Sequence, residues 1–375
     1  MQQFAAGKFI KQDLYKSFQP NFINRQWQIT DMEVMSLLSK ADRELGRLDM
    51  YSNYVPNIEL FISMHVAKEA TQSSKIEGTQ TNIEEALLER DEIPLDKRDD
   101  WEEVQNYIRA LRHSVQLLDK LPFSSRLIRE THRVLMEGVR GEHKQPGEFR
   151  HSQNWIGGAS INDAAFIPPV HHTISDLMGD MEKFVHNEEI YVPELLKIAL
   201  IHYQFETIHP FLDGNGRVGR LMITLYLVSK GILKKPILYL SDFLERNRSH
   251  YYANLMSARE KNDISQWFKF FLVGIAETAQ NGIRTFDSIM QLQKDCDDII
   301  QTMGSRGVNA KKVINELYMR PIFTVDRAAA VADISLPSAY KLVSDLERLG
   351  ILKEITGAQR GRMYMFERYL NLFRS

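Results

Sequence analysis

The sequence has a single cysteine, no long apolar run and almost no net charge. Cys296 has no cysteine to pair with, which excludes an internal disulfide framework and favours a reducing compartment. No apolar stretch reaches the roughly 18 residues that cross a bilayer, and the first residues lack the apolar run of a signal peptide. The formal charge of −2 gives no general attraction to nucleic acid or anionic lipid. We therefore expect a soluble, cytoplasmic protein without membrane contact.

The chain also lacks internal repeats, low-complexity segments and the phosphate-binding sequence G-x-x-x-x-G-K-[ST], so a P-loop is excluded. Hydrophobic residues make up 43% and charged residues 26%, which is the ordinary balance of a soluble globular protein. At 375 residues, the chain is long enough for two or three domains.

Apolar residues recur at helical spacing over most of the chain, which predicts a mainly α fold. In the first clear segment, 58–77, Gly78 stands where a helix usually stops, and Asn82 is placed to cap the next helix. An exception is 149–169, where Gly and Asn-Asp turn signals predict a β-hairpin flap. The same helical pattern recurs over 101–119, 124–140, 173–186, 193–208, 217–230 and 263–281.

The pattern changes after residue 300. Gly304 and Gly307 indicate a linker, and three helices are predicted beyond it, one capped by Thr324 and one beginning at Ser335 with Pro337 in its first turn. The segments ILKEI and MYMFE then predict two strands joined by the turn TGAQRGR. Three helices followed by two strands is the order of a winged helix.

The charge of this C-terminal part does not determine whether it binds DNA or protein. Residues 311–375 carry 11 Lys and Arg against 7 Asp and Glu, with Arg360 and Arg362 in the turn between the strands. A basic face for DNA is therefore one alternative, although Asp345 and Glu347 weaken phosphate attraction. Winged helices also dock proteins or a second copy of the chain, so DNA binding is the lesser reading and a homodimer stays open.

The segment richest in functional residue types is HPFLDGNGRVGR, residues 209–220, between two apolar helical patterns. Gly214 and Gly216 allow successive backbone N–H groups to face one anion, and the N-terminus of the next helix adds its positive end. Arg217 and Arg220 stand three apart, so both guanidinium groups can reach the same polyphosphate. This arrangement predicts a phosphate-binding cradle.

Two further residues of the segment suit phosphoryl chemistry. Asp213 offers a carboxylate beside the cradle, and magnesium is commonly bound by one or two carboxylates plus substrate phosphates. His209, with an ordinary pKa near 6.5, can take a proton from an attacking hydroxyl. Alone, a histidine after a helix or an Asp-Gly-Asn-Gly turn is more often structural. GNGRVG also fits the dinucleotide fingerprint, but a helical pattern precedes it where that motif needs a strand.

Residues 209–220 match every position of H-x-F-x-[DE]-G-N-G-R-x-x-R, so the chain resembles the Fic family. The resemblance implies a helical Fic core in which a Tyr, Ser or Thr hydroxyl of a target protein attacks the α-phosphate of ATP and pyrophosphate leaves. It implies His209 as the base and Asp213 as the ligand of Mg²⁺ or Mn²⁺. Related death-on-curing toxins carry Lys at the position of Gly216, so Gly216 favours adenylyl transfer. The residues implied to bind ATP phosphates are Gly214, Asn215, Gly216, Arg217, Val218, Gly219 and Arg220.

A second resemblance lies upstream, where residues 73–78, SSKIEG, are similar to the inhibitory motif [ST]-x-x-x-E-[GN] of one Fic class. Ser73 and Glu77 are four apart and share a helix face that Gly78 ends. By itself such a pattern is usually an ordinary helix end. Beside a full Fic motif, it implies that Glu77 pairs with Arg220, repels the γ-phosphate and leaves ATP misaligned.

Other segments are assigned by the same resemblance. SDFLERNRSHYYANL is similar to the family's adenosine-side helix, so Asn247, Tyr251 and Tyr252 are expected near the base or ribose, although a Tyr pair on a helix is more often packing. The flap resembles the hairpin that receives the target's modified segment. The flap residues expected nearest the target are Ile161, Asn162, Asp163, Ala164 and Ala165.

Together these features predict an N-terminal extension with the inhibitory helix (1–95), a Fic core (96–290) and a winged helix (300–375). The predicted activity is transfer of AMP from ATP to a hydroxyl of a target protein, and of the chain itself. Two alternatives stay open. One is the reverse hydrolase, in which Glu77 orients a water that removes AMP from a modified protein. The other is a DNA-binding regulator whose Fic core senses ATP.

Overall fold

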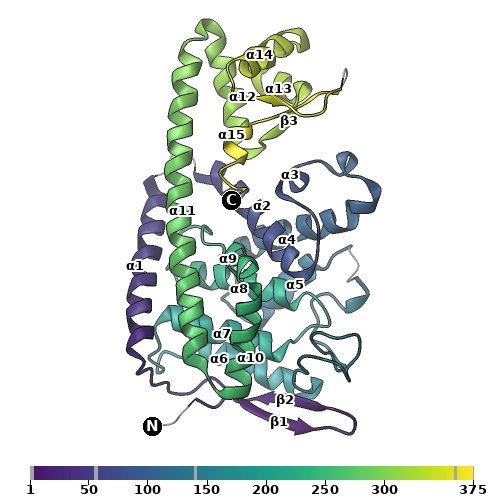
Figure 1. Cartoon of the computed structure of the whole chain (residues 1–375), viewed down its shortest axis with the longest axis vertical. Coiled ribbons are helices and arrows are strands. Elements are labelled where there is room, and N and C mark those ends of the chain that lie inside the picture. Colours follow the sequence, from purple (N-terminus) through teal and green to yellow (C-terminus); the bar gives the residue numbers. More distant parts are fainter. Residues whose placement is uncertain (1–3, 55–57, 139–141, 359–360, 375) are drawn as a thin grey trace.

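The computed structural model describes residues 4–54, 58–138, 142–358 and 361–374, and helices dominate it as the sequence predicts. Two small antiparallel sheets lie at opposite ends of the molecule (Figure 1). The α-helices are α1 (Met32–Tyr54), α2 (Ile58–Glu77), α3 (Ile83–Ala86), α4 (Arg98–Leu117), α5 (Ser125–Leu135), α6 (Ile174–His186), α7 (Glu194–Ile208), α8 (Asn215–Ser229), α9 (Ser241–Arg246), α10 (Arg248–Lys261), α11 (Ile264–Gln301), α12 (Gly307–Met319), α13 (Val325–Ala332), α14 (Leu336–Arg348) and α15 (Glu367–Leu370). The 3₁₀ helices are η1 (Arg90–Glu92), η2 (Leu95–Lys97), η3 (Glu142–Lys144), η4 (His171–Thr173) and η5 (Gly304–Arg306), and the strands are β1 (Gly7–Lys11), β2 (Lys16–Pro20), β3 (Ile322–Thr324), β4 (Lys353–Glu354) and β5 (Met363–Met365).

The helix predicted over 58–77 is α2, with the predicted ends. Gly78 follows it at φ +111°, a value that L side chains rarely adopt. Asn82 caps α3 as expected, since its side chain accepts the Glu85 N–H while the Glu85 carboxylate accepts the Asn82 N–H. The sequence therefore fixes both the end of α2 and the start of the next helix.

Helices α7 and α8 form the centre of the molecule. Every residue of α7 after Glu194 is buried, and most of α8 is buried as well. Apolar side chains lie on most sides of both helices, and a helix of this kind is stable inside a protein, which explains this placement. The loop that joins the two helices carries residues 209–214, so the predicted cradle is held between two central helices.

Helix α11 extends the last predicted core helix, 263–281, by 20 residues, to Gln301. Apolar side chains continue at helical spacing to Ile300, among exposed charged residues, and this pattern keeps one side of the helix buried. In Figure 1, α11 runs alongside α1 and reaches the C-terminal part of the chain. Cys296 is buried in it. No helix in the described ranges has the length and apolarity needed to cross a membrane.

The predicted β-hairpin flap is wrong in one respect: among its described residues it forms a single antiparallel bridge and no regular strand. Ile156 and Phe166 exchange backbone hydrogen bonds of 2.9 and 3.1 Å. Beyond the bridge, the Asp163 carboxylate accepts the N–H groups of Ala159 and Ser160 and closes a compact loop. These local side-chain bonds replace the ladder that a longer hairpin would form.

The C-terminal part contains the three predicted helices, α12 to α14, and the two predicted strands, β4 and β5. A third strand, β3, was not predicted, and the sheet order is β3-β5-β4. Thr324 and Ser335 precede α13 and α14 as expected, but neither side chain makes a capping hydrogen bond. The predicted linker is wrong, because Gly304 and Gly307 lie in η5 and α12. Arg360 lies outside the described residues.

Candidate active site

The loop between α7 and α8 is shaped by two left-handed residues. His209 ends α7 at φ +49°, and Gly214 precedes α8 at φ +75°. The first backbone N–H groups of α8 belong to Asn215, Gly216 and Arg217 and have no acceptor within the helix. The N–H of the fourth residue already bonds Gly214 O at 3.0 Å. The predicted cradle is therefore a helix N-terminus with three donors.

Hydrogen bonds and ring stacking from neighbouring side chains hold the loop in place. The Asn215 side chain accepts the Phe211 N–H and donates to Phe211 O, both at 2.8 Å. The His132 ring stacks on Phe211 with centroids 3.8 Å apart. Its Nδ1 accepts the Gly147 N–H at 2.8 Å, so its Nε2 is the protonated nitrogen and donates to Asp213 O at 3.0 Å. Asn215 thus closes the loop with its side chain and offers phosphate only its backbone N–H.

The structure places Val218 and Gly219 in helix packing, which corrects the prediction that they bind phosphate. Val218 is fully buried in the core. A Cβ on Gly219 would lie 2.2 Å from Glu206 Oε1 and 3.2 Å from the Phe205 ring, so this face of α8 packs directly on α7. Gly219 has no side chain because two helices approach each other there, and Val218 is part of the core.

His209 is held in place through its backbone carbonyl. Arg150 donates to His209 O at 3.0 Å and to Pro169 O at 2.6 Å, which connects the end of α7 to the base of the flap. Desolvation and the Arg150 cation lower the pKa of His209 to about 3. The imidazole is therefore neutral at neutral pH, and its buried Nδ1 has no hydrogen-bond partner among the described residues. A neutral imidazole can accept a proton.

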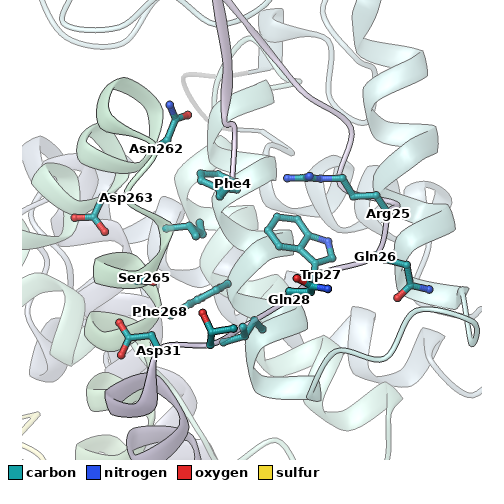
Figure 2. Close-up of a pocket in the computed structure, with 13 residues that line it drawn as sticks. Phe4, Arg25, Gln26, Trp27, Gln28, Asp31, Asn262, Asp263, Ser265 and Phe268 are labelled. Carbon is teal, nitrogen blue, oxygen red and sulfur yellow. The ribbon is translucent and has the colours of Figure 1, made fainter. Parts of the chain in front are cut away.

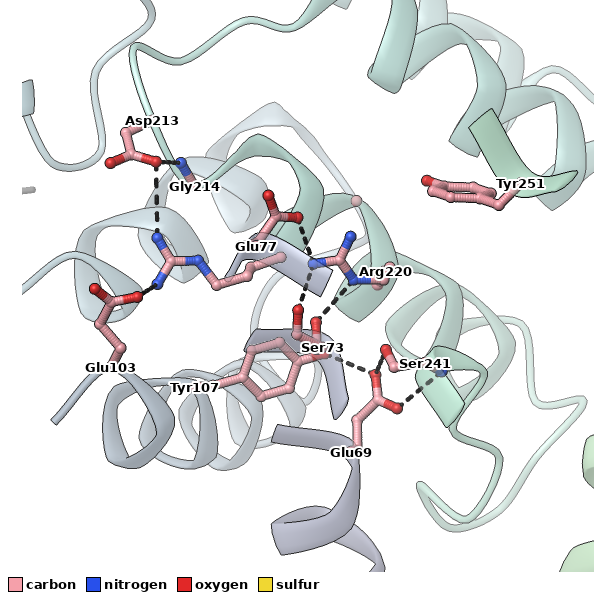
Figure 3. Close-up of polar contacts among 12 residues, drawn as sticks. Glu69, Ser73, Glu77, Glu103, Tyr107, Asp213, Gly214, Arg220, Ser241 and Tyr251 are labelled. Atoms are coloured by element: carbon pink, nitrogen blue, oxygen red, sulfur yellow. Dashed lines mark hydrogen bonds and ion pairs between the residues drawn. The ribbon is translucent and has the colours of Figure 1, made fainter. Parts of the chain in front are cut away.

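The pair expected between Glu77 and Arg220 is present (Figure 3). Arg220 Nη2 donates to Glu77 Oε1 at 2.7 Å and to Ser73 O at 2.8 Å, and Arg220 Nε donates to Ser73 Oγ at 2.8 Å. The Arg220 side chain is 1% exposed and that of Glu77 is 36% exposed. Burial would raise the pKa of Glu77, but the Arg220 cation brings it below its ordinary value, so the carboxylate is charged. Helix α2 thus occupies one whole edge of the guanidinium group.

Gly216 leaves room for this pair. A Cβ on Gly216 would lie 2.2 Å from Glu77 Oε1 and 2.9 Å from Arg220 Nη1. A larger residue at this position would force the Glu77 carboxylate to shift away from its place beside Arg220. The glycine therefore has a steric function besides the freedom of its backbone.

Arg217 contacts a different carboxylate. Its Nη1 donates to Glu103 Oε2 at 2.9 Å, and its Nη2 lies 3.7 Å from Asp213 Oδ1. The Arg217 and Glu103 side chains are 5% and 12% exposed. Asp213 is half exposed, and its Oδ1 accepts the Gly214 N–H at 2.6 Å. Both predicted phosphate-binding arginines are thus paired with carboxylates, one from α2 and one from α4.

The predicted adenosine-side residues separate into two kinds. Tyr251 is buried and its hydroxyl bonds His202 Nε2 at 2.9 Å, so it packs inside the protein. Asn247 donates to Phe243 O at 2.9 Å between α9 and α10, and this bond uses its side-chain amide locally. Tyr252 is 38% exposed, and Glu77 and Arg220 both influence its pKa, which burial raises. Tyr252 alone of these three has an exposed ring close to the candidate site.

Sequence reasoning missed Glu103, Arg150, His132 and Glu69. Glu69 on α2 accepts the hydroxyl of Tyr107 at 2.8 Å and that of Ser241 at 2.6 Å, which holds α2 against α4 and α9 (Figure 3). These residues lie on separate helices and loops, with no fixed spacing to the motif. A weak signal existed for Glu69 alone, as a carboxylate inside an apolar helical pattern.

A cavity of about 700 Å³ lies elsewhere, where the N-terminal segment meets the turn between α10 and α11 (Figure 2). Phe4, Trp27 and Phe268 form its apolar walls, and the Arg25 guanidinium lies 4.6 Å from the Trp27 ring centroid. No residue of 209–220 lines it. The cavity is therefore separate from the candidate site.

Comparisons with known proteins agree with the motif. The model of the Fic/DOC family N-terminal region matches residues 35–116, and the Fic/DOC family model matches residues 122–227. A protein adenylyltransferase Fic from Drosophila erecta is 31% identical over 233 residues, covering 59% of this chain and 43% of that relative. A probable protein adenylyltransferase from Aquifex aeolicus is 28% identical over 251 residues, covering 63% and 70%. The chain spans less than half the length of the insect relatives it matches.

Solved structures resemble most of the fold. A Fic family protein from Desulfovibrio desulfuricans has a TM-score of 0.58 at 18% identity, covering 91% of this chain and 97% of that one. A fragment of Fic-1 from C. elegans has a TM-score of 0.51, also at 18% identity, covering 69% and 74%. The two family models together match half of the chain and include both residues 73–78 and the start of α8. The chain therefore belongs to the Fic/DOC family.

Proposed function

We propose that the chain is a protein adenylyltransferase, which transfers AMP from ATP to a Tyr, Ser or Thr hydroxyl of a target protein and of itself. One observation carries the proposal: the donors at the start of α8, the neutral imidazole of His209 and the two arginines converge on one loop, and α2 covers Arg220. The names of the relatives support the same activity.

In the proposed reaction, the target hydroxyl attacks the α-phosphate and loses its proton to His209, while the bond from the α-phosphate to pyrophosphate breaks. The products are the AMP ester and pyrophosphate. The backbone N–H groups of residues 215–217 and the Arg217 guanidinium bind phosphate oxygens. The flap, at residues 161–165, is proposed to hold the target segment, because its base contacts the loop before α8: Asn154 donates to Phe211 O at 2.9 Å.

The donor set beside the cradle fits a magnesium or manganese ion. Asp213 offers a half-exposed carboxylate, and in the described part of the chain no three His, Cys, Asp or Glu side chains form a cluster that could hold a metal. This suits an ion bound by one carboxylate and by the phosphates of ATP. When bound, the ion would neutralise phosphate charge. Asp213 would hold it, while its backbone is positioned by His132.

We propose further that Glu77 inhibits the enzyme. Its carboxylate occupies Arg220, which is then unable to bind the γ-phosphate, and its negative charge repels that phosphate. A charge-assisted hydrogen bond contributes roughly 1.5 to 3 kcal/mol, so releasing it raises the rate by about 10- to 100-fold. The reverse hydrolase is the second candidate. The charged state of Glu77 favours it, because a carboxylate can orient a water.

The first test is incubation with ATP labelled at the α-phosphate, in wild type, Glu77→Gly, and Glu77→Gly with His209→Ala. We expect strong label in Glu77→Gly, weak label in wild type, and none without His209. If no variant carries label while Glu77→Gly binds ATP and a target is supplied, the transferase proposal is overturned. Release of AMP from a pre-modified protein by wild type would then favour the hydrolase.

The C-terminal part is proposed to be a winged helix, on the order of its helices and its β3-β5-β4 sheet. Leu336 and Tyr340 on α14 are exposed apolar side chains. Exposed apolar groups on this helix favour a protein partner over DNA. DNA binding stays a prediction, which the salt dependence of duplex binding would test.

A further inference from the structure

The two arginines of the cradle are paired with carboxylates in different ways. On Arg220, the edge formed by Nε and Nη2 is fully occupied, by Ser73 and Glu77 of α2. This edge is the one that binds an oxyanion through two parallel hydrogen bonds. A phosphate can reach it only after α2 has withdrawn.

On Arg217, the paired carboxylate of Glu103 lies at Nη1, on the side of the guanidinium group opposite to the Nε–Nη2 edge. Glu103 accepts from Nη1 at 2.9 Å, while Nε is buried and has no partner among the described residues. The remaining contacts of Nη2 are long, 3.7 Å to Asp213 Oδ1 and 3.8 Å to Met136 Sδ. At this edge Nε therefore lacks an acceptor, and Nη2 has only these two long contacts. A buried donor without an acceptor is costly, and an oxyanion at this edge would satisfy it.

We propose that Glu103 is a positioning residue, which holds Arg217 by Nη1 so that its Nε–Nη2 edge receives a phosphate oxygen of ATP. Glu103 and the nucleotide bind Arg217 at the same time, whereas Glu77 and the nucleotide compete for Arg220. The inference rests on the proposed function, and it adds that one carboxylate supports the reaction while the other prevents it.

Glu103 also keeps Arg217 away from Asp213. The two side chains are already 3.7 Å apart, and without Glu103 the guanidinium would move onto the Asp213 carboxylate. That movement would remove both the phosphate donor and the proposed metal ligand from the cradle. Loss of Glu103 therefore has the opposite effect to loss of Glu77, although both are acidic partners of arginines in the same motif.

The test uses the full chain with Glu77→Gly, in which Arg220 is free. Glu103→Gln, Glu103→Asp and Glu102→Gln are added singly to this variant. Glu102 is the matched control, because it is the neighbouring carboxylate on α4 and is paired with an arginine outside the cradle, Arg90, at 2.7 Å. ATP binding is measured by calorimetry, with and without Mg²⁺, and automodification is measured with labelled ATP.

We expect Glu103→Gln to weaken ATP binding by about tenfold and to raise the KM for ATP, with partial recovery in Glu103→Asp and no change in Glu102→Gln. An unchanged ATP affinity in a folded Glu103→Gln protein, or tighter binding, overturns the proposal. A loss of thermal stability without any loss of affinity also overturns it, because Glu103 would then be only structural.

The outcome separates this inference from the proposed function. Weaker ATP binding in Glu103→Gln supports the positioning function of Glu103 even if no variant ever labels a protein. Strong labelling that Glu103→Gln leaves unchanged supports the transferase and overturns the inference.

Discussion

Single side chains determine which charges face the cradle. His209 is neutral because desolvation and Arg150 disfavour its cation, and Glu77 is charged because Arg220 favours its anion. Glu206, one turn before His209 on α7, is different from both. It is 7% exposed, its Oε1 has no partner among the described residues, and desolvation raises its pKa from 4.5 to about 7.

Glu206 is predicted to make stability depend on pH. The unfolded chain loses the Glu206 proton near pH 4.5 and the folded chain near pH 7, so between these values the folded state binds more protons. The free energy of unfolding therefore falls as pH rises through this window, by roughly 3 kcal/mol for this one group. Glu206→Gln is expected to match wild type at pH 4 and to be more stable at pH 8. Urea unfolding at the two pH values measures this, and equal stability at pH 8 would contradict it.

The residues of 209–220 could be predicted because a short, fixed spacing specifies one loop and the first turn of one helix. His209, Gly214 and Arg220 stand in the structure where that spacing puts them. The sequence could not indicate that Gly219 packs on α7, because its neighbours Phe205 and Glu206 come from another helix. Glu103 was missed for the same reason, since a partner about 110 residues away follows no local pattern.

Among the elements, α2 connects parts that are distant in sequence. Its last turn reaches Arg220 through Ser73 and Glu77, and its middle is held by Glu69 to Tyr107 and Ser241. The end of this helix and the start of α3 were predicted because Gly78 and Asn82 are strong local signals. The extent of α11 and the single bridge of the flap were not, because tertiary packing decides both.

Two helical glycines test the packing of the long helices. A Cβ on Gly46, exposed on α1, meets no atom within 4 Å, whereas one on Gly274 in α11 would lie 2.7 Å from the Phe243 ring. We expect Gly46→Ala to stabilise the protein by about 0.5 to 1 kcal/mol, because alanine loses less backbone entropy in a helix. Gly274→Ala is expected to destabilise it by about 1 to 3 kcal/mol, because the ring must move. Chemical denaturation measures both, and the same sign for both would contradict the packing.

In the whole molecule, α2 lies between the cradle and the C-terminal part (Figure 1). The Phe61 ring packs against Tyr318 of α12 at 5.4 Å, and the His65 ring packs against Phe373 at 5.0 Å. The same helix that covers Arg220 is thus anchored on the unit proposed to be a winged helix. A partner that moves this unit would also move α2.

Phe373→Ala is therefore predicted to weaken the proposed inhibition by Glu77 without touching the cradle. Phe373 is 3% exposed, and removing its ring leaves a gap beside His65, so α2 withdraws more readily. A bias of about 1 kcal/mol toward the open state gives roughly fivefold more label from α-labelled ATP, less than expected for Glu77→Gly.

In a Glu77→Gly background the added change should have no effect, because the Glu77–Arg220 pair is already absent. Tyr340→Ala, an exposed residue of the same unit, is the control. An equal gain in both backgrounds would show that Phe373 acts by another route, and no gain in a folded wild-type background would show that the C-terminal unit does not restrain α2.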